Sequence, residues 1–355
     1  MNTGRSSRII VMISAVLAVL TPLSAQDRSD PGQAQYVTID VPGARATVGA
    51  SINSAGTIAG YYEDAASATH GFVRGPDGTI TTFDAPGAGE GPFLGTWPTS
   101  INSDGAITGY YFDSQQVGHG FARSYKGSIL TFDAPGAGTS PVQGTFAWSI
   151  NSKGAITGYY QDANSVFHGF LLEGDRGFSN WEAPGASAVP GFGTYAQDMN
   201  ARGAIVGSYI DSTSAYHGYW RTPRGVFIEF DAPPDSSYLL PMSINSDEAI
   251  TGYYDDSSHM AHGFLRTRDG TLTTFDAPGA VATYGQEINA DGEIVGYYLD
   301  TSFHGFLRTP DGTITTLDPP GSIHTEILSI NSKGAITGYY EDTNSVSHGF
   351  LLGEE

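Results

Sequence analysis

Nine histidines are the side chains of this sequence that could most readily bind a metal or transfer protons near neutral pH. Seven of them recur once in every copy of a repeated segment, at His70, His119, His168, His217, His262, His304 and His348. We place each on the third strand of its own repeat, about 9–10 Å outside the innermost strand. A metal ion needs its ligand nitrogens at about 2.0–2.1 Å, so these histidines cannot converge on one ion. We therefore expect no metal site, and we expect each histidine to form hydrogen bonds within its own repeat.

An aspartate precedes most of these histidines by six residues. The aspartates are Asp64, Asp113, Asp162, Asp211, Asp256 and Asp342, and in the sixth repeat Asp300 precedes its histidine by four residues. Aspartate and histidine would stand at facing ends of adjacent strands, so we predict that each pair bridges the loop between them.

Two histidines lie outside the repeated pattern. His259 follows a run of Asp and Ser at 255–258. His324 precedes Glu326 in what we expect to be a short loop near the mouth of a central channel. Either histidine could act as a general base on a loop face. Isolated surface histidines are common, so we assign no catalytic residue.

A repeated unit positions all of these residues. Its marker is the Asn of an Ile-Asn or Met-Asn step, which occurs at Asn53, Asn102, Asn151, Asn200, Asn245, Asn289 and Asn331. The successive spacings are 49, 49, 49, 45, 44 and 42 residues. A period of about 40 to 50 residues with strand-like composition is typical of propeller blades.

Each unit is predicted to contain four short strands. In the third copy the first strand ends at Ile150, the second covers 155–160 and the third begins at His168. The fourth strand is clearest at 79–87, Thr-Ile-Thr-Thr-Phe-Asp-Ala-Pro-Gly. β-branched and aromatic residues fill these runs, and Gly, Pro, Asn and Asp separate them. No stretch of the mature chain has helical periodicity, so we predict an all-β fold.

Glycines recur at fixed places in the unit. Asn-Ser-x-Gly, as at 151–154, suits a hairpin turn that ends in a left-handed Gly. Glu248 replaces this Gly in one copy, where we expect a strained or rebuilt turn. Gly158 lies inside a second strand, which predicts a bulge or the close approach of a neighbouring side chain.

The two ends of the chain complement each other. Residues 36–44 read as a fourth strand with no unit before it, and residues 348–352 as a third strand with no fourth strand after it. Pairing the two would leave no open edge to promote aggregation. An open solenoid would instead need polar caps, and none is evident. We predict a seven-bladed β-propeller of four-stranded blades, residues 36–355, closed when the N-terminal strand completes the last blade.

The pattern Ile-Asn-x-x-Gly…Gly-Tyr-Tyr…His-Gly-Phe-Leu resembles the HAF-type extracellular repeat, with Gly where that family usually has Ala after the His. The resemblance covers residues 36–352 and recurs seven times. It implies an extracellular repeat protein. It implies no activity, because that family has no settled one.

Tyrosine pairs end the second strands, as at Tyr159 and Tyr160. Neighbouring residues of a strand point to opposite faces, so one ring would lie on each face of the blade. Because blades pack face to face, we interpret these rings as core between blades rather than as platforms for sugars. The Phe of each His-Gly-Phe triplet receives the same interpretation.

The copies differ most in the segments that lead from a fourth strand into the next unit. The interval from the Pro of Ala-Pro to the residue before the marker step is 14 in three consecutive copies, at 86–100, 135–149 and 184–198, and 9 or 10 in the others. These segments carry Phe93, Trp97, Phe146, Trp148, Phe192 and Tyr195. Aromatic residues with Gly and Pro on long loops over a rigid scaffold favour a site for an apolar or carbohydrate ligand. The alternative is that these loops plug the channel.

Residues 1–25 are predicted to be a secretory signal, with Arg5 and Arg8 before an apolar run at 9–20 and a small-residue cleavage site. The run is too short to span a membrane, and the alternative is an anchor that stays attached. Residues 26–35 are predicted to be a flexible leader. The chain has no Cys, which excludes disulfides and lipid anchoring through cysteine. We expect a secreted protein, periplasmic or extracellular.

The excess of acidic residues excludes some classes of partner. Lys and Arg number 16 against 37 Asp and Glu, and no cluster of Lys or Arg is evident. Such an acidic surface repels nucleic acid and anionic membranes, so we expect neither as a partner. We also expect no membrane insertion after the signal is removed, and a monomer.

No phosphate-binding Gly loop, zinc-protease motif, nucleophile elbow or calcium loop occurs, so we expect no cofactor. The sequence favours a non-catalytic binding or surface-interaction module for a glycan or another extracellular ligand, including a protein. The alternative is an extracellular polysaccharide lyase or other carbohydrate-active enzyme, which rests on analogy between folds. A purely structural component of the envelope would bind no saturable ligand.

Overall fold

The computed structural model of the chain describes residues 35–353. The predicted signal, 1–25, and nearly all of the predicted leader, 26–35, lie outside the described residues. The described residues form one compact unit. It is built of β-strands, with one short 3₁₀ turn, η1 (Gly174–Arg176). No helix among the described residues is long and apolar enough to cross a membrane. The fold is all-β, as the sequence predicts.

The strands pair in antiparallel groups of four, and we call each group a unit. The first strands of the units are β2 (Ala46–Ile52), β6 (Gly95–Ile101), β10 (Gly144–Ile150), β14 (Gly193–Met199), β18 (Tyr238–Ile244), β22 (Ala282–Ile288) and β26 (His324–Ile330). The second strands are β3 (Ile58–Glu63), β7 (Ile107–Phe112), β11 (Ile156–Gln161), β15 (Ile205–Ile210), β19 (Ile250–Asp255), β23 (Ile294–Leu299) and β27 (Ile336–Glu341). The third strands are β4 (Thr69–Arg74), β8 (Gly118–Arg123), β12 (Phe167–Glu173), β16 (Tyr216–Arg221), β20 (Ala261–Arg266), β24 (Phe303–Arg308) and β28 (Ser347–Leu352). The fourth strands are β5 (Ile80–Phe83), β9 (Ile129–Phe132), β13 (Gly177–Trp181), β17 (Phe227–Phe230), β21 (Leu272–Phe275), β25 (Ile314–Thr316) and β1 (Tyr36–Ile39).

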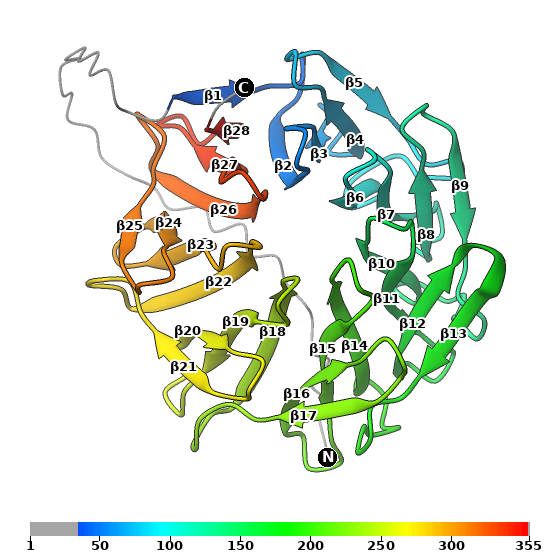
Figure 1. Ribbon diagram of the computed structural model, residues 1–355. Coiled ribbons are helices and arrows are strands. Elements are labelled where there is room, and N and C mark those ends of the chain that lie inside the picture. The colour runs from blue at the N-terminus through cyan, green and yellow to red at the C-terminus, as the bar shows by residue number, and fades with distance from the viewer. Residues whose placement is uncertain (1–34, 354–355) are drawn as a thin grey trace, which may run out of the picture. The chain divides into compact units, whose positions relative to one another are not determined.

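The units are arranged in a propeller-like ring, with their first strands innermost and their fourth strands outermost (Figure 1). β1 pairs antiparallel with β28, and Tyr36 lies opposite Leu352. Four first strands also form a single parallel bridge to the third strand of the preceding unit, as between Gly144 and Gly118. These bridges join 20 strands into one continuous sheet.

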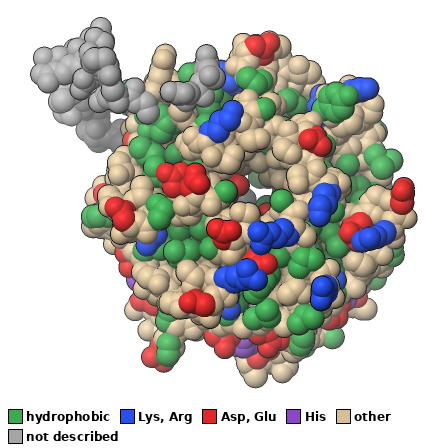
Figure 2. Space-filling view, viewed as in Figure 1, with side chains coloured by type: hydrophobic (Ala, Val, Ile, Leu, Met, Phe, Trp, Pro, Cys, Tyr) green, Lys and Arg blue, Asp and Glu red, His purple; other side chains and the backbone are tan. Residues whose placement is uncertain are grey.

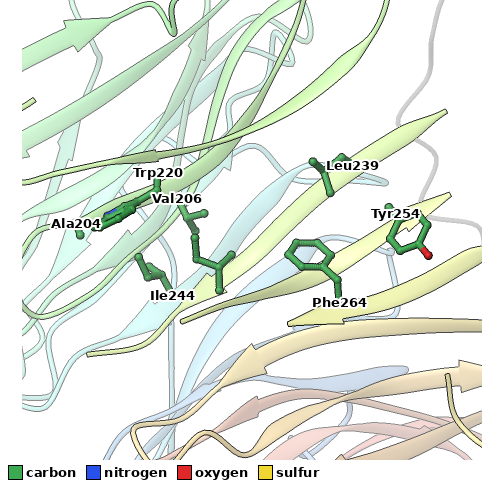
Figure 3. Packing of buried hydrophobic residues seen from close by; sticks show 8 residues of the cluster. Ala204, Val206, Trp220, Leu239, Ile244, Tyr254 and Phe264 are labelled. Atoms are coloured by element: carbon green, nitrogen blue, oxygen red, sulfur yellow. The ribbon is translucent and has the colours of Figure 1, made fainter. Parts of the chain in front are cut away.

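The hydrophobic core lies between neighbouring units. Figure 3 shows one cluster, in which Val206 of β15 and Trp220 of β16 meet Leu239 of β18 and Phe264 of β20. The aromatic residue of each His-Gly-Phe triplet is fully buried. These residues are Phe72, Phe121, Phe170, Tyr219, Phe264, Phe306 and Phe350. The prediction that this position belongs to the core is confirmed.

Gly158 shows why a glycine recurs inside the second strand. A Cβ atom at this position would collide with the carbonyl oxygen of Phe146 and the Cα of Ala147. The first strand bulges at the same place, because its register shifts between Ala147 and Ser149. The glycine therefore accommodates the close approach of the bulged strand, as the sequence predicts.

The turn at Glu248 keeps the conformation of the glycine that it replaces. Glu248 has a φ of 65°, close to the 77° of Gly154 at the same place in the third unit. A side chain is strained in this left-handed region. The Glu248 carboxylate lies 2.9 Å from Nε of Arg268, an ion pair with the neighbouring turn. The prediction of a strained turn is confirmed.

The marker asparagines link each unit to the next. In six places the side-chain amide donates a hydrogen bond to the backbone carbonyl of the next marker Asn, at 2.9–3.4 Å. These links run from Asn53 to Asn102, Asn102 to Asn151, Asn200 to Asn245, Asn245 to Asn289, Asn289 to Asn331 and Asn331 to Asn53. Asn151 instead contacts Sδ of Met199 at 3.7 Å. All seven side chains are buried, so the marker serves the architecture.

A second set of links uses the residue before the marker step. Ser329 accepts a hydrogen bond from the N–H of Ile52 at 3.1 Å. In two units this residue is a carboxylate, Asp198 or Glu287. Glu287 accepts from the N–H of Ile330 at 2.8 Å. Burial raises the pKa of Glu287 to about 7.

Candidate functional site

The two faces of the ring carry different connections. The loop face carries the loops between second and third strands, such as 64–68, and the connections between units, such as 84–94. The turn face carries the hairpin turns that follow the first and third strands, such as 53–57 and 75–79. The sequence placed its candidate binding residues on the loop face.

Lys and Arg are unevenly distributed between these two faces. Apart from Arg45, the Lys and Arg residues of the described chain lie on the turn face, at the ends of third strands or in the hairpin turns. They are Arg74, Arg123, Lys126, Lys153, Arg176, Arg202, Arg221, Arg224, Arg266, Arg268, Arg308 and Lys333. Figure 2 shows Lys and Arg side chains gathered around a central opening. The sequence contains no run of Lys or Arg, and these residues reach one face only because the folded ring brings the ends of different units together.

Each repeated histidine stands between two acidic side chains on the loop face. Nε2 of His119 lies 3.5 Å from Asp113, and Nδ1 lies 2.8 Å from Asp133. The ring also stacks on Tyr111, with 4.9 Å between centroids. The hydrogen bond to Asp133 raises the pKa of His119. The predicted Asp–His pairs are confirmed in all seven units, at 3.3–3.8 Å.

The second acidic partner was missed from the sequence. It follows the histidine by 14 residues in six units, at Asp84, Asp133, Glu182, Asp231, Asp276 and Asp318. For His348 it is Asp40, just after β1, at 2.7 Å. The constant offset was the signal that could have revealed it. Both nitrogens of each ring face carboxylates, and the described residues hold no group of three His, Asp or Glu that could bind a metal.

Four of the six predicted aromatic residues lie on strands, which corrects their placement in long loops. Trp97 is on β6, Phe146 and Trp148 are on β10, and Tyr195 is on β14. The interval from the Pro to the marker step includes the whole first strand, so counting it overstated the loop. These side chains consequently stand on the innermost strands, beside the central opening.

Phe93 and Phe192 are the two residues that remain in connections. Phe93 is 83% exposed and has a φ of 62°. Phe192 is partly buried, and its carbonyl accepts a hydrogen bond from the N–H of Phe167 at 2.9 Å. The ring contacts between described residues join the other four aromatic residues but not these two.

Tyr110 and Tyr159 connect the four aromatic residues on the first strands into a continuous row of rings. Trp97 stacks on Tyr110 at 5.7 Å, and Tyr110 meets Phe146 of the next unit at 5.4 Å. Tyr159 lies 5.5 Å from Phe146, 6.1 Å from Trp148 and 5.2 Å from Tyr195. We call Trp97, Tyr110, Phe146, Trp148, Tyr159 and Tyr195 the aromatic wall.

The tyrosines of the wall were expected only as core. Tyr159 does pack between units, and its burial raises its pKa to about 12. Trp97, Trp148 and Tyr195 are only partly buried, so the wall also presents ring surface. Such a surface on rigid inner strands can hold an apolar or carbohydrate ligand.

Two positions of the last unit break the symmetry of the innermost strands. Glu326 lies opposite Tyr339, and the equivalent residues of the other units are apolar or aromatic: Val48, Trp97, Phe146, Tyr195, Leu240 and Tyr284. His324 lies opposite Glu341, and its equivalents are Ala46, Gly95, Gly144, Gly193, Tyr238 and Ala282. His324 begins β26, which corrects its placement in a loop.

His324 and Glu326 form one polar group at the loop-face end of the inner strands. His324 Nε2 lies 3.0 Å from Oε1 of Glu326. The imidazole is held between Phe303, at 4.9 Å, and Tyr339, at 5.7 Å. Both polar side chains are about one-fifth exposed, at 22% and 18%. A mostly buried histidine beside a carboxylate has the arrangement of a general base oriented by an acid.

His259, the other histidine outside the pattern, has weaker contacts. It has a φ of 61° in an exposed turn and lies 3.4 Å from the hydroxyl of Ser237. Neighbouring Asp255 has a raised pKa, chiefly because it is buried. The structure brings His259 close to neither the aromatic wall nor His324, because it lies on the loop after β19.

A pocket of about 340 Å³ opens on the turn face, between the last and first units. Ser54, Arg74, Asn331, Lys333 and Leu351 help to line it. Its lining contains neither His nor a carboxylate. It lies at the opposite ends of the strands from the aromatic wall, so the two are separate features.

No protein-family model and no curated protein matches this sequence. Solved structures do match the fold. A streptogramin B lyase structure has 15% identity and a TM-score of 0.57, covering 90% of this chain and 98% of its own. A catalytically inactive variant of virginiamycin B lyase from Staphylococcus aureus, crystallised with quinupristin, has 15% identity, a TM-score of 0.58, and coverage of 90% and 99%.

An acylaminoacyl peptidase from Pyrococcus horikoshii is a third structural match. It has 11% identity and a TM-score of 0.54, and the match covers 86% of this chain and 51% of the peptidase. At these identities the likeness shows the fold alone. The chemistry of this chain must therefore be argued from its own residues.

Proposed function

We propose that this protein is a secreted β-propeller that binds a glycan on its loop face without chemically changing it. The observation that carries the proposal is the aromatic wall, a run of touching rings contributed by three consecutive units. The hydrophobic faces of sugar rings pack on such aromatic surfaces, and neighbouring polar groups select the orientation of the ligand. The wall stands on inner strands, so the site is rigid before the ligand arrives.

The proposal includes seven blades closed by the N-terminal strand. It is supported by the pairing of β1 with β28 and by the contact of His348 with Asp40 at 2.7 Å. The hydrogen bond from Asn331 to the carbonyl of Asn53 adds a link from the last unit to the first. We further propose that the units are HAF-type extracellular repeats and that residues 1–25 direct export.

A glycan array with the mature chain, residues 26–355, tests the proposed function. The decisive variant carries Trp97→Ala and Trp148→Ala, which remove the two largest rings of the wall. Tyr125→Ala is the matched control, because Tyr125 is a 67% exposed aromatic residue of the turn face. We expect a hit that the double variant loses and the control keeps. If the folded double variant still binds the same glycan, the aromatic wall is excluded as the binding site.

A second candidate function is a polysaccharide lyase or another carbohydrate-active enzyme. The observation that favours it is the 3.0 Å contact between His324 and Glu326, which could hold a general base at the channel mouth. Incubation with a panel of polysaccharides would reveal new reducing or unsaturated ends. If the protein forms a product and His324→Ala does not, the enzymatic function replaces the binding function. Binding without any product would exclude it.

A further inference from the structure

Glu326 has no architectural role that the other units share. Six equivalent residues are apolar or aromatic, and those units pack in the same way. The change is also paired, because His324 replaces a small residue or Tyr at a second inner position of the same strand. The Glu326 carboxylate is only partly buried, at 18% exposure, and its Oε1 contacts His324. A carboxylate that is partly withdrawn from water is stabilised by further polar or charged partners. A ligand that needs a negative charge here would explain both replacements.

Aromatic residues surround Glu326, which carries a negative charge. Tyr339 lies opposite Glu326 on the paired strand β27. The charge of Glu326 adds to burial in raising the pKa of Tyr61, Tyr297 and Tyr339. Phe303 and Tyr339 enclose the neighbouring imidazole. A carboxylate beside aromatic rings favours an organic cation, through direct charge pairing and through cation–π contact with any ring face that the imidazole leaves free.

No Lys or Arg side chain of the described residues forms an ion pair with Glu326, whose partner is His324. Among residues 35–353, Arg45 is the one Lys or Arg on the loop face, and its guanidinium hydrogen-bonds to Ser67 at 2.5 Å. Glu63, Asp255 and Glu341 end second strands on the same face and add negative charge. The positive residues gather at the opposite end of the opening (Figure 2). This separation draws cations toward the loop face and repels anions from it.

We propose that the Glu326 group binds the protonated amine of the ligand. The inference rests on the proposed function, since the aromatic wall of the second to fourth units would hold the sugar rings while Glu326, on the inner strand of the last unit, meets the amine. The glycan class is then an aminosugar polymer with free amino groups. Neutral N-acetylated chains should bind more weakly, and uronic-acid chains should be rejected.

Calorimetry on the mature chain tests this preference with three matched oligosaccharides. One carries free amines, one is fully N-acetylated, and one consists of uronic acid. A hydrogen bond to a charged group contributes about 1.5–3 kcal/mol, so the amine form should bind roughly 10- to 100-fold more tightly than the acetylated form. Equal affinity for the amine and acetylated forms, or tighter binding of the uronic-acid form, would overturn the proposal.

Two variants test whether Glu326 is the source of the preference for free amines. Glu326→Gln and Glu326→Leu should remove it while leaving the acetylated chain bound, and the Leu variant copies Leu240 at the equivalent position of the fifth unit. Glu90→Gln is the control, because it removes an exposed charge in a loop-face connection. An amine preference that persists in folded Glu326 variants would overturn the assignment.

A third probe separates this inference from the proposed function. Glucosamine and tetramethylammonium can be titrated alone while tyrosine side-chain signals are followed by NMR. If no oligosaccharide binds but these cations bind in a Glu326-dependent way, the amine site stands and the glycan function fails. If glycans bind without preference for the free-amine form and neither small cation binds, the proposed glycan-binding function stands and the amine site is refuted. If nothing binds, both are refuted.

Discussion

Asn331→Ala should destabilise the protein by breaking a link between its last and first units. The side chain donates to the carbonyl of Asn53 at 2.9 Å, and accepts from the N–H groups of Lys333 at 2.9 Å and Ala335 at 3.0 Å. A hydrogen bond contributes about 0.5–1.5 kcal/mol net, and a buried group left unsatisfied costs about 1–3 kcal/mol. Because exposed Lys333 can bind water instead, we expect a loss of about 3 kcal/mol in the free energy of unfolding.

Asn151→Ala is the matched control within the same chain. Residues 149–160 and 329–340 have identical sequences. Asn151 makes the same two turn hydrogen bonds, at 2.9 and 3.1 Å, but its amide meets the sulfur of Met199 instead of a carbonyl. Thioether sulfur is a weak acceptor, so this variant should lose about 1 kcal/mol less.

Equilibrium unfolding in urea, followed by circular dichroism, measures both losses. For a domain of this length 1 kcal/mol corresponds to about 1.5 °C, so Asn331→Ala should lower Tm by about 4–5 °C. Equal losses in the two variants would refute the carbonyl link as the source. An unchanged stability of Asn331→Ala would refute the closing role of this residue.

Three further predictions concern charged groups. The pKa of Glu287 is raised to about 7, so its contribution to stability falls as the pH rises from about 4.5 through 7. Glu287→Ser introduces the residue of most other units and should flatten this decline in stability, measured by urea unfolding at several pH values. A variant with the same pH profile as the original protein would contradict the prediction. His119 has a raised pKa because of its hydrogen bond to Asp133, so its contribution is complete below about pH 6.5 and is lost as pH rises through the raised value. His119→Ala should therefore lower Tm more at pH 6 than at pH 9, and an equal decrease would refute the linkage. Glu248→Gly removes left-handed strain of about 1 kcal/mol but also the ion pair between the buried Glu248 carboxylate and Arg268, which contributes about 0–1 kcal/mol because the guanidinium remains exposed to water. We expect unchanged or slightly higher Tm, and a decrease of several degrees would show that the strain is absent.

Local patterns made most strands predictable. The runs of β-branched and aromatic residues placed β11 and its equivalents, because most of them contain a Tyr pair and all begin after a turn that starts with the marker Asn. Gly158 and Glu248 were interpretable for the same reason, since their conformations depend on nearby residues. The Asp–His pairs followed from a short loop between adjacent strands.

Contacts between distant parts of the chain were harder to predict. The acid 14 residues after each histidine lies beyond an intervening hairpin, so its approach depends on strand pairing. Trp97 and Trp148 were assigned to loops because the interval from the Pro to the marker step was counted as loop, although it contains the first strands β6 and β10. The uneven distribution of Lys and Arg between the faces depends on strand direction, which no local run of Lys or Arg reveals.

The central claim is that the aromatic wall binds the ligand, and intrinsic fluorescence tests it most directly. The chain has four Trp residues, and Trp181 and Trp220 are 9% and 7% exposed. Trp97 and Trp148 belong to the wall, so a bound glycan should change their emission in a saturable titration. We predict that Trp97→Phe with Trp148→Phe abolishes this change while binding weakens only partly. A saturable change that remains at full amplitude in the double variant would place the ligand elsewhere and contradict the account.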